Sequence, residues 1–117
     1  MEMIRELVLR EENKHMIERY YNENNELAVL ISPGFGIGWS TDNFIDELAW
    51  DKRIVEYWMN KHPKKEKMKT FLESIGYINV SMYGYDELEI HWISKGTAFY
   101  INNYDGSEYI STNVHIA

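Results

Sequence analysis

A glycine-punctuated loop is the segment of the chain best suited to binding chemistry. Residues 32–41 read Ser-Pro-Gly-Phe-Gly-Ile-Gly-Trp-Ser-Thr and lie between a short apolar run and the start of an expected helix. A strand, a glycine-rich turn and a helix N-terminus together let backbone N–H groups surround an anion. The residues that would form such a binding loop are Gly34, Phe35, Gly36, Gly38, Trp39, Ser40 and Thr41.

Two features of this loop argue against a bound nucleotide. Its spacing, Gly-x-Gly-x-Gly, matches neither the dinucleotide fingerprint nor the phosphate-binding loop, whose lysine is also missing. Asp42, Asp46 and Glu47 follow closely and would repel a phosphate. The simpler interpretation is a tight connection whose glycines permit positive φ or close packing, while Phe35 and Trp39 fill the core.

A glutamate and a histidine two positions apart form the other pair capable of chemistry. Glu89 and His91 would share one face of a strand, with Tyr100 opposite, as in a metal site or an acid–base pair. One histidine and one glutamate are a poor ligand set, and the other histidines have no spacing relation to them. The chain has no cysteine, which excludes thiolate ligands, cysteine nucleophiles and disulfides. We therefore expect no catalytic residues, no metal and no cofactor, and a binding protein rather than an enzyme.

Composition narrows the class of partner. The 117-residue chain has the length of one domain and a formal net charge of −7. A net negative charge disfavours sequence-independent binding of nucleic acid. It is typical either of a soluble protein or of a surface that imitates nucleic acid. No signal-peptide pattern is present, and the longest apolar run, Leu27–Ile31, is far shorter than the ~20 residues of a membrane span. We expect a cytoplasmic protein that binds neither nucleic acid directly nor a membrane.

The hydrophobic pattern divides the chain into helices and strands. A helix is expected over about residues 12–21, and Leu27–Ile31 is typical of a strand buried on both faces. A helix then begins near Ser40, Thr41 or Asp42, allows a break at residues 51–53, and ends at His62-Pro63. Its apolar stripe comprises Phe44, Ile45, Leu48, Val55, Trp58 and Met59. The next helix presents Met68, Phe71, Leu72 and Ile75 on one face and ends at Gly76.

Beyond residue 77 the hydrophobic pattern changes to a period of two residues, which is typical of strands. With Asp105-Gly106 as a two-residue hairpin turn, Tyr104 faces Ser107 and Ile101 faces Ile110. With Lys95-Gly96 as a second such turn, Trp92 faces Phe99 and Ile90 faces Ile101. Together the two registers collect Leu88, Ile90, Trp92, Phe99, Ile101 and Ile110 on one face. The sequence therefore predicts an α+β fold, with an antiparallel or mixed sheet whose C-terminal three-stranded meander packs on two to three helices.

The opposite face of that meander is rich in tyrosine. Its candidate partner-binding residues are His91, Tyr100, Asn102, Tyr104 and Tyr109. Amphipathic and fairly rigid side chains of this kind bind partners at low entropy cost. Tyrosine also has a high strand propensity and decorates exposed sheet faces without any function. Both interpretations of the tyrosine-rich face stay open.

Four blocks of the chain resemble the signature of a family of small uncharacterised phage and prophage proteins of Gram-positive bacteria. They are Ser32–Thr41, Asp51–Glu56, Trp92 with Lys95–Thr97, and Tyr104–Glu108. The resemblance makes residues 27–112 a family core and residues 1–26 a variable N-terminal extension within one domain, 1–117. Family members usually carry an acidic residue where this chain has Asn103, which faces Glu108, so asparagine relieves a repulsion between like charges.

The resemblance implies a phage setting and no known activity. We therefore expect an accessory protein that binds a host or phage protein, or itself as a dimer. Counter-defence, such as inhibition of a CRISPR nuclease, is a natural use of such a protein. The alternatives are a minor virion or morphogenesis protein, and a small-molecule or nucleotide binder that uses the glycine-rich loop.

Overall fold

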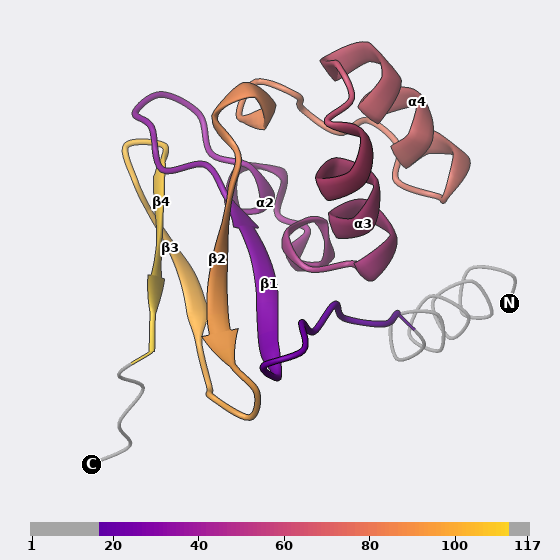
Figure 1. Cartoon of the computed structure of the whole chain (residues 1–117). Helices are drawn as coiled ribbons and strands as arrows, with labels where there is room; N and C mark the ends of the chain where they lie inside the picture. Colours follow the sequence, from indigo (N-terminus) through magenta and orange to yellow (C-terminus); the bar gives the residue numbers. More distant parts are fainter. Residues whose placement is uncertain (1–16, 113–117) are drawn as a thin grey trace, which may run out of the picture.

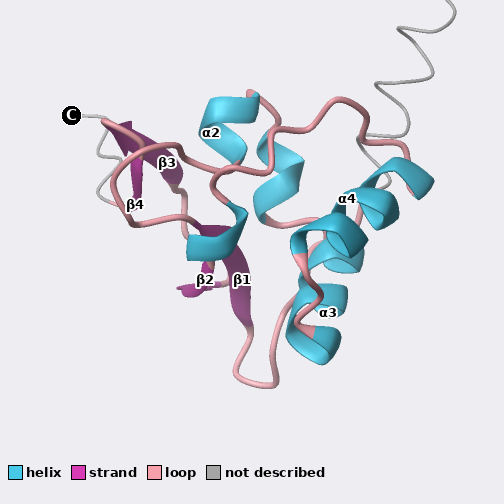
Figure 2. Cartoon of the chain, turned by 90° about the horizontal axis from the view of Figure 1, so that it is seen from above, coloured by secondary structure: helices cyan, strands magenta, loops and turns pink. Residues whose placement is uncertain are grey.

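The computed structural model describes residues 17–112 and confirms the α+β class. The strands are β1 (Glu26–Ile31), β2 (Glu89–Ser94), β3 (Tyr100–Tyr104) and β4 (Ser107–Ser111). The helices are α2 (Ser40–Asn43), α3 (Lys52–Lys61) and α4 (Lys65–Ser74), with short 3-10 helices η1 (Asp46–Ala49) and η2 (Tyr85–Glu87). The β3–β4 hairpin lies on one side of β1 and β2, and α3 and α4 lie on the other (Figures 1 and 2). Within residues 17–112 no helix is long and apolar enough to cross a membrane.

Strand β1 lies between two hydrophobic cores. Ala28 and Leu30 belong to the core that the helices complete, together with Trp39, Leu48 and Ile54. Leu27, Val29 and Ile31 alternate with them and belong to a second core on the hairpin side. The prediction that this apolar run is a strand buried on both faces is therefore confirmed, and the run holds the two outer layers together.

The predicted three-stranded meander is wrong in one of its two pairings. β3 and β4 pair in the expected register, with Tyr104 opposite Ser107 and Ile101 opposite Ile110. Lys95-Gly96 also forms the expected turn, since Thr97 N donates to Ser94 O at 3.0 Å. Beyond that turn, however, β2 pairs with β1, and β3 belongs to a separate two-stranded sheet.

This change of partner also separates the apolar face predicted for the meander. Ile90 and Trp92 pack against the core on the helix side. Phe99, Ile101 and Ile110 pack against the second core, on the other side of β1. The physical reason is that β1 presents apolar side chains on both faces, and the hairpin covers the face that the helices leave open.

The helix expected from residue 40 onward is divided into α2, η1 and α3. Phe44 ends α2 in the left-handed conformation at φ 55, and its N–H donates to Thr41 O. Its side chain is 91% exposed, so its predicted place on the buried stripe is wrong. The breaks and ends predicted further on are confirmed. Asp51 caps α3 by accepting from Arg53 N at 2.9 Å, α3 ends before His62-Pro63, and α4 buries Met68 and Leu72.

The described residues of the helix predicted over 12–21 are not helical. Tyr21 forms an antiparallel bridge with Leu27, and Arg19 forms one with Asp51. Asn22 then closes a tight turn, because its side-chain oxygen accepts from Asn24 N and Glu26 N. Residues 17–21 are therefore an extended segment ahead of this turn, and the earlier part of the predicted helix lies outside the described residues.

The Asp51–Glu56 block has a structural explanation. Asp51 is 1% exposed and accepts from Arg53 Nη2 at 2.7 Å and from the Tyr77 hydroxyl at 2.8 Å. Burial, together with that hydrogen bond to Asp51, raises the pKa of Tyr77 above its ordinary value. Asp51 thus joins the start of α3 to the segment that follows α4, with its charge compensated by Arg53.

The fold is expected to lose stability in alkaline solution through Tyr85. This residue is buried, its hydroxyl donates to Pro63 O, and burial raises its pKa from 10.0 to about 12, with Tyr57 and Asp86 adding to the shift. A pKa raised on folding means that the contribution to stability is complete below pH 10 and is lost as the pH rises toward 12. Urea denaturation should therefore show a smaller alkaline loss in Tyr85→Phe than in the wild type. Parallel losses in the two proteins would contradict this assignment.

Candidate functional site

The glycine-rich loop lies against the turn between β3 and β4 (Figure 1). Gly36 N donates to Asp105 O at 3.1 Å, and Ser107 Oγ donates to Pro33 O at 2.6 Å. Glu108 N donates to Ser32 O at 2.9 Å. Residues 32–41 and 103–108 therefore form one unit, called here the loop–hairpin junction. Two of the sequence blocks, far apart along the chain, are in direct contact there.

The side chain of Glu108 holds this junction together from the inside. It is 1% exposed, and its Oε1 accepts from Ser32 N at 2.8 Å. Its Oε2 accepts from Trp39 N at 2.8 Å, from Thr41 N at 3.0 Å and from Thr41 Oγ1 at 2.6 Å. Four donors around one buried carboxylate form a charge-assisted network. The loop does surround an anion, as its composition predicts, and that anion belongs to the protein itself.

Because the Glu108 carboxylate already uses N–H groups of the loop, the loop is poorly suited to an external anion. Besides the donors that Glu108 uses, Gly38 N donates to Asp42 and Gly36 N donates to Asp105. A phosphate entering the loop would have to displace the Glu108 carboxylate from its hydrogen bonds. The geometry therefore agrees better with the simpler interpretation of the loop, a tight structural connection.

The two aromatic side chains predicted to fill the core behave differently. Trp39 is fully buried, and its Nε1 donates to Leu48 O at 2.9 Å. Phe35 is 82% exposed, so its predicted place in the core is wrong. The loop leaves β1 and projects Phe35 outward at its tip, while the start of α2 directs Trp39 inward. Among the remaining candidate loop residues Ser40 is buried, Thr41 is half-buried, and Gly34 lies beside the Glu87 side chain.

Glycine is required at two points where the loop and the hairpin approach each other. A Cβ on Gly38 would lie 2.8 Å from both Thr41 Oγ1 and Asn103 Nδ2, and 2.9 Å from Glu108 Oε2. A Cβ on Gly106 would lie 1.9 Å from Gly36 O, and the residue has φ +86. Gly106 lets the hairpin turn meet the loop backbone to backbone, and Gly38 leaves room for the side chains around Glu108.

Asn103 extends the network around Glu108. The two residues are opposite each other in the hairpin, as the register predicts. The Nδ2 of Asn103 donates to Thr41 Oγ1 at 2.7 Å, and its Oδ1 accepts from Gly106 N at 2.8 Å. An asparagine here therefore supplies a donor that a carboxylate lacks, besides avoiding a second negative charge beside Glu108.

The tyrosine-rich face exists on the hairpin but lacks one predicted member. Tyr100, Asn102 and Tyr104 share one face of β3 with Tyr109 of β4, and the three tyrosines are 52%, 68% and 51% exposed in chain order. His91 lies on β2, opposite Val29 of β1, so its predicted pairing with Tyr100 is wrong. In the described part of the chain no group of three His, Asp or Glu side chains could hold a metal ion.

The segments that meet at or beside the junction carry several exposed apolar side chains. The set, called here the aromatic surface, consists of Phe35, Ile37, Phe44, Tyr83 and Tyr104, with exposures of 82%, 44%, 91%, 75% and 68%. Three contacts bring the segments of these residues together. Gly36 N donates to Asp105 O, and a Cβ on Gly84 would lie 2.9 Å from Ile37 O. The Asn43 side chain donates to Ser81 O and accepts from Ser81 N. Exposed apolar groups gathered in this way mark interaction sites.

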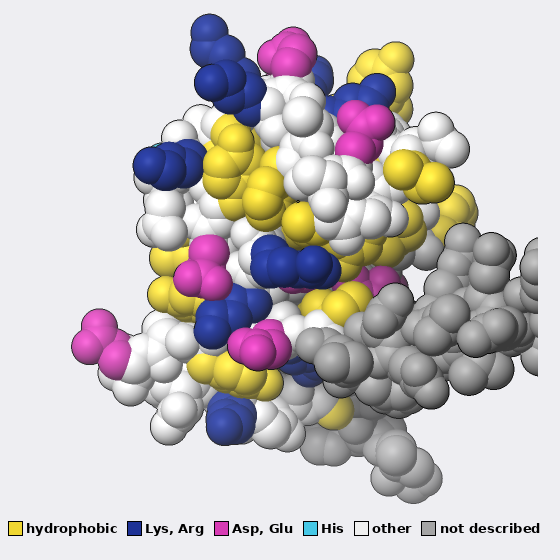
Figure 3. Space-filling model, turned by 90° about the vertical axis from the view of Figure 1, so that its right-hand side faces the viewer, with side chains coloured by type: hydrophobic (Ala, Val, Ile, Leu, Met, Phe, Trp, Pro, Cys, Tyr) yellow, Lys and Arg dark blue, Asp and Glu magenta, His cyan; other side chains and the backbone are white. Residues whose placement is uncertain are grey.

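The charges beside the aromatic surface are acidic. Asp42, Glu87 and Asp105 are exposed there, and Glu87 approaches the loop at Gly34. The side of the molecule formed by α3 and α4 is different, because Lys and Arg side chains lie among Asp and Glu on its described part (Figure 3). One ion pair near α4, Lys65 Nζ to Asp86 Oδ2 at 3.2 Å, illustrates that mixture.

Several residues of this site could not be picked out by their spacing alone. Ile37, Phe44 and Tyr83 come from three segments that only the fold brings together. Glu108 did carry a signal, because strand alternation places it on the same hairpin face as Ile110, which packs against the second core. Comparison of the chain with protein-family models, with curated proteins and with solved structures finds no match.

Proposed function

We propose that this chain is a phage or prophage accessory protein that acts in the host cytoplasm by binding another protein through the aromatic surface. The observation that carries the proposal is that Phe35, Phe44, Tyr83 and Tyr104, each more than two-thirds exposed, lie on segments that meet at or beside the loop–hairpin junction. Aromatic side chains are the commonest anchors of protein interfaces. The phage setting rests on the resemblance of the four sequence blocks.

The backbone beneath this surface is suited to recognition because it is held in place before any partner arrives. Glu108 fixes the loop through four hydrogen bonds, and Trp39 anchors it in the core. A surface ordered in advance gives up less conformational entropy on binding. The exposed side chains of the loop tip and of the hairpin turn are therefore presented in a fixed relation to each other.

The charge of the site indicates a basic partner. Asp42, Glu87 and Asp105 flank the aromatic side chains, and the whole chain carries a net charge of −7. Arginine side chains satisfy both features, since they pair with carboxylates and stack on aromatic rings. A second copy of the chain would bring acidic groups against acidic groups. Occupying the basic nucleic-acid cleft of a host defence nuclease is the use that fits this surface best.

Removal of two of the exposed aromatic side chains tests the proposal. Proteins captured from phage-infected cells are identified, purified and titrated against the wild type and against Phe35→Ser/Tyr104→Ser. We expect the double variant to bind the purified partner at least about 100-fold more weakly, because each hot-spot aromatic contributes about 2 kcal/mol or more. Thermal stability should change little, since both side chains are exposed.

The matched control is Ile78→Ser, which removes an exposed apolar side chain outside the aromatic surface. Affinity of the wild type for the partner should fall as salt is raised, because the flanking carboxylates contribute to binding. Equal affinities of the double variant and the wild type would overturn the proposal. So would an affinity independent of salt, or self-association as the only binding detected.

A further inference from the structure

The end of the sheet opposite the loop–hairpin junction holds a pocket of about 400 Å³. Its lining residues are Arg19, Tyr21, Leu27, Ser94, Lys95, Gly96, Thr97 and Ala98. We infer that this pocket binds a phosphate group, either free or as a small phosphomonoester. The inference is independent of the aromatic surface, with which the pocket shares no residue.

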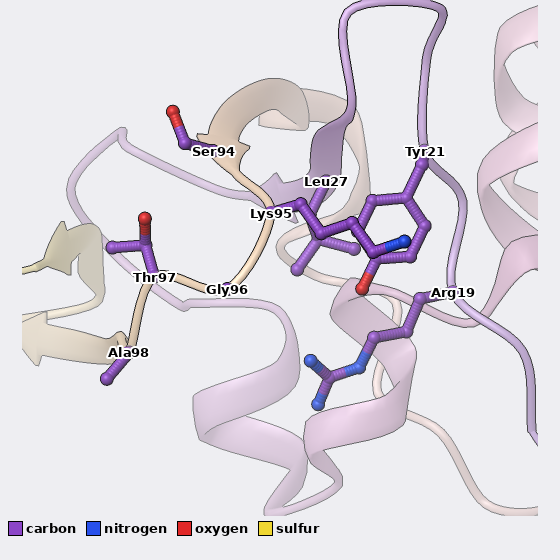
Figure 4. A pocket seen from close by; sticks show the side chains of 8 residues that line it. All are labelled: Arg19, Tyr21, Leu27, Ser94, Lys95, Gly96, Thr97 and Ala98. Carbon is purple, nitrogen blue, oxygen red and sulfur yellow. The ribbon is translucent and has the colours of Figure 1, made fainter.

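The pocket exists because β3 leaves β2. After the Lys95-Gly96 turn the chain does not continue the β2 ladder but crosses toward the second core. The extended segment before β1 lies beside the same turn, where Lys95 N donates to Asn25 O at 2.9 Å. Figure 4 shows Tyr21 and Arg19 on one side of the resulting space and Ser94, Thr97 and Ala98 on the other.

Two cationic side chains of the pocket are held in place by aromatic rings. The Arg19 guanidinium carbon lies 4.4 Å from the ring centroid of Trp50, and Lys95 Nζ lies 5.1 Å from that of Tyr21. Neither forms a salt bridge with a carboxylate among residues 17–112, whereas Lys52, Arg53 and Lys65 each do. Contacts with ring faces orient a cation without neutralising it.

Among residues 17–112 no carboxylate lines the pocket. Two glutamates adjoin lining residues in the sequence. Glu18 precedes Arg19, and its Oε2 lies 3.4 Å from Lys52 Nζ. Glu26 precedes Leu27 in β1, so strand alternation directs it to the opposite face of the sheet from the pocket. Its Oε1 accepts from Asn22 Nδ2 at 3.0 Å. The chain as a whole carries a net charge of −7. The described lining of this pocket is instead positively charged, because it holds Arg19 and Lys95 and no carboxylate.

The charge and the lining indicate the class of ligand. Two positive charges match a phosphomonoester, which carries roughly −1.5 to −2 at neutral pH, better than they match a single carboxylate. Arg19 and Lys95 both belong to residue types that bind phosphate, and the Thr97 hydroxyl adds a neutral donor. Tyr21 and Leu27 supply an apolar wall for an attached organic group. A volume of about 400 Å³ also falls within the usual size range of small-molecule sites.

Calorimetric titration of the full chain with adenosine 5′-monophosphate tests this inference. We expect saturable binding that weakens at least tenfold in Arg19→Gln and in Lys95→Gln. The control variant Lys69→Gln removes one exposed positive charge from α4 and should bind as the wild type does. Adenosine alone should bind at least tenfold more weakly than its monophosphate.

Competition with inorganic phosphate separates the two sources of the group. Inorganic phosphate that competes as well as the nucleotide assigns the site to free phosphate, and weaker competition assigns it to an ester. Absence of saturable binding by either anion would overturn the inference, as would binding that Lys95→Gln leaves unchanged. Melting temperatures of the variants close to that of the wild type exclude misfolding as the cause of a loss.

Discussion

Replacing Glu108 with alanine is expected to lower the free energy of unfolding by about 4 kcal/mol, because buried donors that lose a charged acceptor are costly. The carboxylate is 1% exposed and accepts from Ser32 N, Trp39 N, Thr41 N and Thr41 Oγ1. Alanine would leave all four donors without this acceptor and a void between loop and hairpin. Urea denaturation at neutral pH, read from tryptophan fluorescence, measures the loss directly.

Two further variants separate the charge from the shape of Glu108. Glu108→Gln keeps the volume but turns an NH₂ group toward donors, so we expect about half of the alanine effect. Glu89→Ala removes an exposed glutamate from β2 and should change stability by less than about 0.5 kcal/mol. A loss below about 1 kcal/mol in Glu108→Ala would contradict the role assigned to the carboxylate.

The second large effect is expected at Gly106. An alanine Cβ there would lie 1.9 Å from Gly36 O, and the residue has φ +86. The Cβ is fixed to the backbone of the turn, and Gly36 O belongs to the backbone of the loop, so neither atom can rotate away. The loop and the hairpin turn must therefore separate, and we expect the free energy of unfolding to fall by at least about 3 kcal/mol. Exposure of the Trp39 environment should follow, as a red shift of tryptophan emission.

Gly96→Ala is the matched control for this prediction. Gly96 has a similar φ of +88, but a Cβ there would meet nothing within 4 Å. Its substitution therefore measures the backbone strain alone, about 1–2 kcal/mol. The difference between the two variants reports the contact between loop and hairpin. Equal losses at both glycines would show that the junction contributes no stability of its own.

Local signals were sufficient to predict much of the fold. The Asp105-Gly106 turn determines the β3–β4 register, since a one-residue slip would reverse the faces of every side chain. The continuous apolar run of β1 indicates burial on both faces, and proline after His62 ends α3. In each case a rule about neighbouring residues determines the outcome.

The pairing of β2 could not be predicted in the same way. The Lys95-Gly96 turn forms as expected, but a turn does not decide whether the strands on either side continue to pair. That depends on which faces of β1 remain uncovered once the helices have packed. The choice is made by the tertiary structure, where β2 takes the open edge of β1 and the hairpin takes its open face.

The candidate site was predicted in part for a related reason. The glycine-rich loop and the hairpin tyrosines were each identified from the sequence, but their contact depends on Glu108, 67 residues beyond Thr41. Phe35 and Trp39 are both large aromatic residues of the same loop. Only the direction of the chain at the start of α2 distinguishes the exposed ring of Phe35 from the buried ring of Trp39. Phe44 is exposed because it adopts the left-handed conformation that ends α2.

The central claim, that the aromatic surface binds a basic protein partner, is tested most directly by photo-crosslinking in phage-infected cells. A benzophenone amino acid replaces Tyr104 in one protein and Lys69, on the exposed side of α4, in another. We predict that position 104 crosslinks to one protein through a segment rich in Arg and Lys, and that position 69 does not. Crosslinks from position 69 alone, or from position 104 only to a second copy of the chain, would contradict the claim.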